Sequence, residues 1–268
     1  MIPLRDDQPT STFPIVTVLL IATNVLVFLA QQAAPAINDV FSMVPYRVTH
    51  PQDLMPYIAQ VTPMGVVGHH VPPGVHNIVL GPNEIFVGPG WAPAWQTIFT
   101  SMFMHGSLLH IGGNMLYLWI FGNNIEDALG KVRFLLFYLV CGVAAALAQI
   151  VSDPSSLIPT LGASGAIAGV LAAYWVLYPD ARVLTIVPVF IYFLAQIRAY
   201  WVLGFWIVLQ VFQGLSGLGM QRGGGVAYFA HIGGFVAGLL IIHLLGGQRL
   251  VARQRRRVLY YPPPGGYY

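Results

Sequence analysis

Apolar residues gather in six stretches that are long enough to cross a lipid bilayer. A transmembrane helix needs about 20 mostly apolar residues. The predicted helices cover residues 14–31, 97–121, 132–151, 161–178, 200–217 and 227–246. A further apolar stretch, 183–197, is too short for a comfortable span, contains Pro188 and lies between Arg182 and Arg198. We interpret it as an interfacial or re-entrant segment.

Basic residues support this topology. With the N-terminus in the cytoplasm, Arg47 and Arg222 are the two of the 12 Lys and Arg residues that lie outside. Cytoplasmic loops of membrane proteins carry an excess of such residues. Six spans with both termini in the cytoplasm satisfy that rule, whereas a seventh span would place the basic C-terminal tail outside.

Composition agrees with a membrane protein. Hydrophobic residues make up 56% of the 268 and charged residues 8%, against about 25% charged in soluble domains. We expect an all-α fold of six transmembrane helices with a long first external loop at 32–93. The chain divides into a cytoplasmic tail (1–13), a membrane core (14–247) and a basic tail (248–268) that we expect to be disordered and to rest on anionic lipid headgroups.

Targeting and redox features are sparse. The single cysteine, Cys141, excludes an intrachain disulfide. No small-residue cleavage site follows the first apolar stretch, so we interpret it as an uncleaved span. Together with the charge pattern, this favours a bacterial plasma membrane.

Two polar residues stand where hydrocarbon is expected. Residues 162–165 read Gly-Ala-Ser-Gly, and residues 230–234 read Ala-His-Ile-Gly-Gly. Ser164 and His231 each precede the inner end of their helix by 15 residues, or roughly 22 Å. His110 lies at a similar depth in its own stretch, so the three side chains are expected at one level, roughly 10 Å below the outer surface of a core about 30 Å thick.

Small residues allow the two helices to approach each other. Gly165 and Gly169 are four residues apart, as are Gly234 and Gly238, a spacing that permits close helix packing in lipid. None of the nine Asp and Glu residues lies in the middle of a span. A catalytic unit here would therefore be a Ser-His dyad, in which the histidine activates a weakly nucleophilic hydroxyl.

These motifs resemble those of the rhomboid family of intramembrane serine proteases. The Gly-Ala-Ser-Gly and Ala-His-Ile-Gly-Gly segments are similar to the nucleophile and histidine motifs of that family. The segment from His105 to Asn114 resembles its second-span element, and Glu126, Gly130 and Phe134 resemble its cytoplasmic E-x-x-x-G-x-x-x-F stretch.

The resemblance implies a rhomboid bundle and a function. Ser164 would be the nucleophile and His231 the general base and then acid. His110, Asn114 and Gly162 would stabilise the oxyanion. Structural support would come from the following residues: His105, Gly165, Gly169, Gly234, Gly238 and Glu126. The expected partners are transmembrane-protein substrates and the lipid bilayer, with no nucleic acid, no cofactor and no metal; the oligomeric state is open.

One position departs from the family pattern. An aromatic residue commonly follows the serine by one helical turn and stacks on the histidine, but here that position is Ala168. We hypothesise that Tyr228 or Phe235 supplies the contact. The glycine-rich loop 217–225 is a candidate lid, and the 200–217 helix a candidate lateral gate.

Several residues have simpler interpretations. Glu126 and Asp127 are expected to tie the second loop to Arg133 or to backbone donors, and His243 is expected to be structural. The first loop contains four histidines without regular ligand spacing, which we interpret as polar loop residues: His50, His69, His70 and His76.

Two other functions remain as alternatives. A catalytically silent rhomboid-like protein would bind membrane proteins without cutting them, and it would be expected to lack the serine or the histidine. A transporter or channel would be expected to carry intramembrane carboxylates or inverted repeats, and neither is evident in the sequence.

Overall fold

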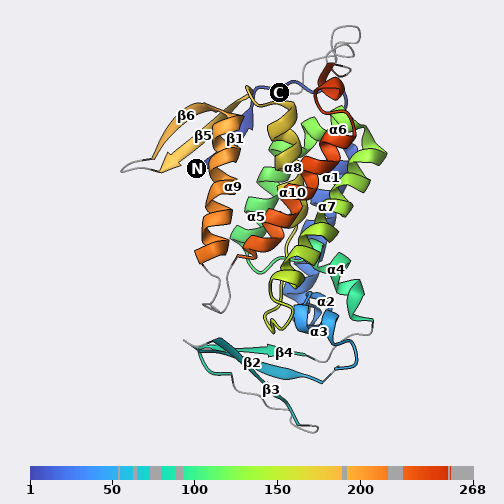
Figure 1. Ribbon diagram of the computed structural model, residues 1–268, viewed down its shortest axis with the longest axis vertical. Helices are drawn as coiled ribbons and strands as arrows, with labels where there is room; N and C mark the ends of the chain where they lie inside the picture. The colour runs from blue at the N-terminus through green and yellow to red at the C-terminus, as the bar shows by residue number, and fades with distance from the viewer. Residues whose placement is uncertain are drawn as a thin grey trace.

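Helices pack into a bundle at the centre of the protein (Figure 1). The computed structural model describes residues 1–53, 55–62, 65–72, 80–88, 93–188, 192–216, 226–252 and 254. The bundle helices are α1 (Ile15–Ala33), α5 (Leu108–Tyr117), α6 (Asn123–Leu129), α7 (Lys131–Ser152), α8 (Ser164–Leu177), α9 (Ala199–Ser216) and α10 (Tyr228–Leu244). Within the described ranges, α1, α7 and α9 are long and apolar enough to cross a membrane, and α8 and α10 are shorter apolar helices.

The second predicted helix begins later than its hydrophobic pattern indicated. Residues before it form the short helix α4 (Thr97–Thr100) and a 3₁₀ turn (Ser101–Phe103). The main helix starts at Leu108 because the Ser107 hydroxyl accepts a hydrogen bond from the His110 N–H at 3.1 Å, which caps the first turn. A π-helical turn (Leu118–Gly122) joins α5 to α6, and Gly130, with φ of +82°, ends the segment.

The described residues of the apolar stretch 183–197 form two paired β-strands and no helix, and the interfacial or re-entrant placement of this stretch stays a prediction. Strands β5 (Arg182–Pro188) and β6 (Tyr192–Arg198) pair antiparallel, and β1 (Ile2–Asp6) pairs with β5. The buried side chains of Val183, Thr185 and Val187 alternate with more exposed ones, as expected for a β-strand. Residues 1–13 are therefore not a free tail, because they supply one strand of this sheet.

The first external loop also contains regular structure. It holds α2 (Ala36–Phe41), α3 (Pro45–Thr49), β2 (Tyr57–Thr62), β3 (Gly65–His70) and β4 (Glu84–Val87), followed by a 3₁₀ turn (Ala94–Gln96). The sheet order is β3-β2-β4, and Tyr57, Ala59 and Val87 on its inner face pack with Val44. Two three-stranded sheets thus correct the all-α prediction. They lie at opposite ends of the bundle (Figure 1).

Two carboxylates on α6 bind residues near the beginning of the chain, and one of them also binds Gln254. Glu126 accepts hydrogen bonds from the Val16 and Thr17 N–H groups at 3.0 and 2.8 Å, which caps the start of α1. Asp127 accepts from the Ser11 N–H at 2.9 Å and from the Gln254 amide at 2.6 Å. The expectation of backbone donors for this pair is confirmed.

The described residues after α10 pack against the bundle. Leu250 and Val251 are buried in the core, and Gln254 bonds to Asp127. A disordered tail is therefore a wrong prediction for 248–252 and 254, and the rest of the tail lies outside the described residues.

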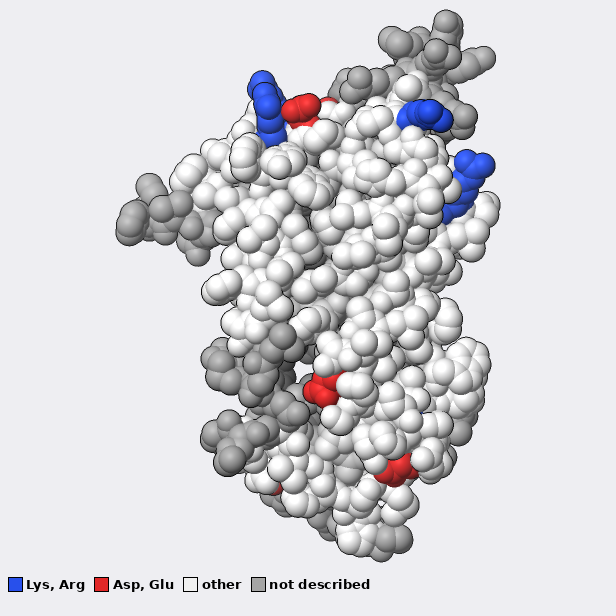
Figure 2. Space-filling model, viewed as in Figure 1, with Lys and Arg blue, Asp and Glu red and all other residues white. Residues whose placement is uncertain are grey.

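Charged side chains are separated along the bundle (Figure 2). On the face shown, Lys and Arg appear only at the end that carries β5 and α6, while a broad band without charged residues crosses the middle. At the basic end, the Tyr174 hydroxyl and the Asn124 amide both donate to Asp6. Burial raises the pKa of the Asp6 carboxyl to about 6.

Candidate active site

Ser164 and His231 meet at the ends of two neighbouring helices. Ser164 is the first residue of α8, and His231 lies in the first turn of α10. The Ser164 Oγ and the His231 Nε2 are 2.7 Å apart, which is hydrogen-bonding distance. His231 is buried, with 7% of its surface exposed, and Ser164 is half-buried. This geometry is the one that a serine nucleophile and its imidazole base require.

Glycines set the distance between α8 and α10. A methyl group at Gly234 would overlap the carbonyl oxygen of Gly165, and one at Gly238 would lie 2.6 Å from the Gly169 Cα. A Cβ at Gly169 would in turn lie 2.5 Å from the Cys141 Sγ on α7. The predicted close approach of backbones is thus present in the structure.

The His231 ring is held on its other sides by α9. Its Nδ1 lies 2.7 Å from the Gln210 Oε1. The Trp206 ring lies against it, with centroids 5.6 Å apart and planes inclined at 36°. The hypothesis that Tyr228 or Phe235 supplies this ring contact is therefore wrong for the described residues: Phe235 packs behind, against Trp206 at 6.4 Å.

Sequence reasoning missed Trp206 and Gln210, although a signal existed. They are four residues apart, so they lie on one face of α9. A glutamine in an apolar span is a polar group that needs a partner. The pattern does not say, however, which helix that face meets.

His110 approaches Ser164 from α5. A Cβ placed on Gly162 would lie 2.8 Å from the His110 Nε2 and 3.6 Å from the Ser164 Oγ. Gly162 therefore lies between these two side chains, and its φ of +128° is a conformation that favours glycine. Residues His110, Ser164 and His231 are brought to one end of the bundle, as their expected depth indicated.

Two oxyanion candidates already make hydrogen bonds in the structure. The Gly162 N–H donates to the Ser101 carbonyl at 2.9 Å, and the absence of a side chain at Gly162 leaves space for His110. The Asn114 amide donates to the His110 carbonyl at 3.1 Å, one helical turn back. The oxyanion roles of both residues stay predictions.

His105 is a buried residue with an anchored backbone. Its N–H donates to the Gln31 Oε1 at 3.0 Å, and its ring packs edge-on against that of His110, with centroids 5.0 Å apart. The expected anchoring role fits this geometry, because Gln31 belongs to α1.

The residues described contain no group of three or more His, Cys, Asp or Glu side chains that could hold a metal ion. Of the loop histidines, His70 lies 3.5 Å from Asp53 and is largely exposed. His50 stacks on Tyr46, with centroids 4.3 Å apart. His76 and the candidate lid 217–225 lie outside the described residues.

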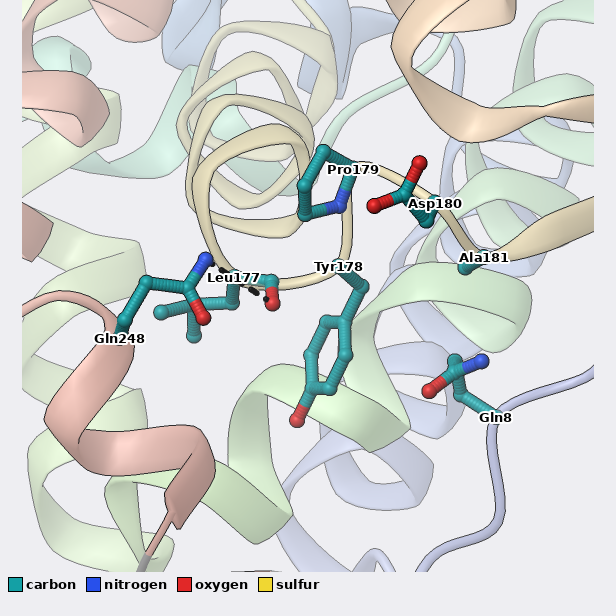
Figure 3. Close-up of a pocket in the computed structure, with 7 residues that line it drawn as sticks. All are labelled: Gln8, Leu177, Tyr178, Pro179, Asp180, Ala181 and Gln248. Atoms are coloured by element: carbon teal, nitrogen blue, oxygen red, sulfur yellow. Dashed lines mark hydrogen bonds between the residues drawn. The ribbon is translucent and has the colours of Figure 1, made fainter.

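Two cavities differ in their relation to the dyad. A small one, of about 30 Å³, borders Ser164 and is lined largely by small side chains. A larger one, of about 490 Å³, lies at the opposite end of α8 between Gln8, Tyr178 and Gln248 (Figure 3). Since α8 runs for 14 residues, or roughly 20 Å, between the two, the larger cavity takes no part in chemistry at Ser164.

Comparisons with known proteins agree with the motifs. A family model described as the Rhomboid domain matches residues 92–248, more than half of the chain. Rhomboid protein 1, mitochondrial, from Saccharomyces cerevisiae is 31% identical over 149 residues, which is 54% of this chain and 40% of that protein. Rhomboid protease GluP from Bacillus subtilis is 39% identical over 79 residues, 30% of this chain and 15% of that protein.

A human protein shows the same region of similarity. Presenilin-associated rhomboid-like protein, mitochondrial, from Homo sapiens is 40% identical over 93 residues, 34% of this chain and 24% of that protein. In each case the match spans less than half the length of the curated relative. Two of these relatives are named as mitochondrial proteins, and one is from a bacterium. The comparisons therefore do not support the expectation of a bacterial plasma membrane.

Proposed function

Since this chain belongs to the rhomboid family, we propose that it is an intramembrane serine endopeptidase that cuts peptide bonds in or near transmembrane segments of other proteins. The observation that carries the proposal is the 2.7 Å contact between the Ser164 Oγ and the His231 Nε2 at the ends of two apolar helices. In a span, a histidine is by default a functional residue, and here it contacts a potential nucleophile.

The dyad acts as base and then as acid. The His231 Nε2 takes the Ser164 proton while the Oγ attacks the substrate carbonyl carbon. The imidazolium returns that proton to the leaving amine, the C–N bond breaks, and an acyl-enzyme forms. A water molecule then attacks the ester while the His231 Nε2 takes its proton. The C–Oγ bond breaks, the proton returns to the Ser164 Oγ, and the acid product leaves. No Asp or Glu follows Asp180 in the sequence, so no carboxylate on α9 or α10 assists.

Donors for the oxyanion come from two elements. The first N–H groups of α8 have no partner within the helix, and the helix dipole favours negative charge there. His110 faces the same point across Gly162. Losing one donor of this kind typically costs about 2.7–4 kcal/mol in the barrier.

Water and substrate reach the site from the outer side in this proposal. The cavity beside Ser164 has room for about one water molecule and is bordered by the polar residues Ser101 and Thr160. We place the basic end of the bundle in the cytoplasm, which puts the dyad nearer the outer surface. Six segments would cross the membrane: α1, the helix from α5 to α6, α7, α8, α9 and α10.

Cleavage of a generic transmembrane substrate by purified protein in liposomes tests the proposal. We expect Ser164→Ala and His231→Ala to lose activity by about 10⁴-fold or more, while Ser155→Ala, at an exposed loop serine, retains it. Cleavage by Ser164→Ala at the wild-type rate would refute the dyad. A wild-type protein that neither cuts nor reacts with a serine-directed phosphonate would instead be a catalytically silent binding protein.

A further inference from the structure

A glutamine and a tryptophan on α9 enclose the candidate base. Gln210 and Trp206 are one helical turn apart, and both contact the His231 ring. Gln210 has 8% of its surface exposed and His231 has 7%. Their hydrogen bond of 2.7 Å is therefore shielded from competing water.

The bond determines which ring nitrogen carries the proton. A carbonyl oxygen can only accept, so the Gln210 Oε1 requires a proton on the His231 Nδ1. A neutral imidazole with its proton on Nδ1 has a free lone pair on Nε2, which is the atom that faces the Ser164 hydroxyl. Gln210 thus selects the tautomer that a general base needs.

Trp206 supplies the ring contact to His231 that an alanine at position 168 cannot supply. Ala168, one turn after Ser164 on α8, is fully buried and has no ring to offer. The Trp206 indole comes instead from α9 and lies against the imidazole. It limits rotation of the ring about its Cβ–Cγ bond, so that both nitrogens keep their partners.

We propose, on the premise that the protein is a serine protease, that Gln210 is the positioning residue of the dyad and that Trp206 fixes the ring plane. The catalytic unit is then a Ser-His pair oriented by a neutral amide. It is assembled from α8, α9 and α10, and the base is aligned only while α9 is docked against α10.

Two substitutions at one position separate positioning from packing. Gln210→Leu keeps the approximate size but removes the acceptor, so we expect kcat to fall about tenfold or more with KM little changed. Gln210→Glu supplies an anionic acceptor that stabilises the protonated ring, so the acid limb of the pH profile of kcat should move upward by about one pH unit. Trp206→Phe should retain most of the activity and Trp206→Ala should lose it.

The matched control is Gln213→Leu, the same change on α9 at an exposed position, which should match the wild type. Among the described residues, His110 is the other titratable group that faces Ser164, and Gln210 and Trp206 are the α9 residues that contact the His231 ring. The shift of the acid limb is therefore measured in variants that keep His110. Thermal unfolding in detergent checks that every variant is folded.

The readouts are peptide cleavage and the rate of labelling by a serine-directed phosphonate, each measured across pH 5–9. Wild-type kcat in Gln210→Leu, or an unmoved acid limb in Gln210→Glu, would overturn the positioning role. If the wild type fails to label, or if Ser164→Ala labels equally well, the protease proposal itself fails, and the two failures are distinguishable.

Discussion

Replacement of Gly234 by alanine tests how strictly the α8–α10 spacing controls the site. A methyl group there would overlap the Gly165 carbonyl oxygen and lie 2.9 Å from the Gly165 carbonyl carbon. Carbon atoms in contact prefer about 3.5–4.0 Å, so the two helices must separate by about 1 Å. Overpacking of this kind costs about 1–3 kcal/mol of stability.

The same displacement acts on the dyad, because Gly234 is one helical turn from His231 and Gly165 adjoins Ser164. Lengthening the 2.7 Å contact by about 1 Å takes it beyond hydrogen-bonding distance. A misplacement of that size costs about 10²-fold in rate. We therefore expect Gly234→Ala to lower kcat about 10²-fold and to lower the Tm.

The assays are substrate cleavage and thermal unfolding of purified protein in one detergent. Gly112→Ala on α5 is the control, since a Cβ there meets nothing within 4 Å, and it should leave the Tm unchanged or raise it slightly. A Gly234→Ala protein with wild-type kcat and Tm would refute the inference that the glycine contact fixes the dyad.

Two other predictions concern the basic end of the bundle. Glu126 is buried and accepts three hydrogen bonds from Val16 and Thr17. Glu126→Ala should lower the free energy of unfolding by about 3 kcal/mol because those donors lose their partner. Glu126→Gln should lower it less, and equal Tm values for the two variants would contradict this account. The pKa of Asp6 is about 6 in the folded protein, against 3.8 for a free carboxyl, so the folded protein binds the Asp6 proton more tightly than the unfolded chain does. The contribution of protonated Asp6 to the free energy of unfolding is therefore full below pH 3.8 and is lost as the pH rises through 6. Asp6→Asn should remove this dependence and stabilise the protein at pH 7 by on the order of 2 kcal/mol; a Tm that follows pH 4–7 as in the wild type would count against it.

Much of the site was predictable because it depends on short, local motifs. Ser164 and His231 each stand at the start of an apolar stretch, so their depth follows from helix rise alone. The glycine spacing indicates that the two helices can pack closely. These features need no knowledge of how the rest of the bundle is arranged.

The contacts of the histidine ring were not predictable in the same way. Ala168 shows that the usual aromatic residue is missing, but the residue that replaces it comes from another helix. Which face of α9 meets α10 depends on packing between segments distant in sequence. Trp206 and Gln210 were therefore visible as a pair, but not as neighbours of His231.

The β-structure was missed for two different reasons. Residues 182–188 alternate in burial and are rich in β-branched residues, a signal that the high apolar content of the stretch concealed. The first loop contains short strands between Pro and Gly residues, where the turn signals dominate. Strand β1 could not be inferred locally, because its partner β5 lies about 180 residues further along the chain.

Helix α9 is held firmly at its N-terminal end, so a small tilt of the helix would displace residues further along it. At this end, the Ala199 N–H donates to the Ala181 carbonyl at 2.8 Å, and the Tyr200 N–H donates to the Pro179 carbonyl at 3.0 Å. Strands β5 and β6 of the β1–β5–β6 sheet directly precede the helix. Gln210 lies 11 residues after Ala199, about 16 Å along the helix axis. A tilt of about 5° would swing it by roughly 1.4 Å, enough to release the Nδ1 of His231. A tilt of α9 too small to alter the shape of the bundle would thus break the Gln210–His231 hydrogen bond and leave the base unaligned.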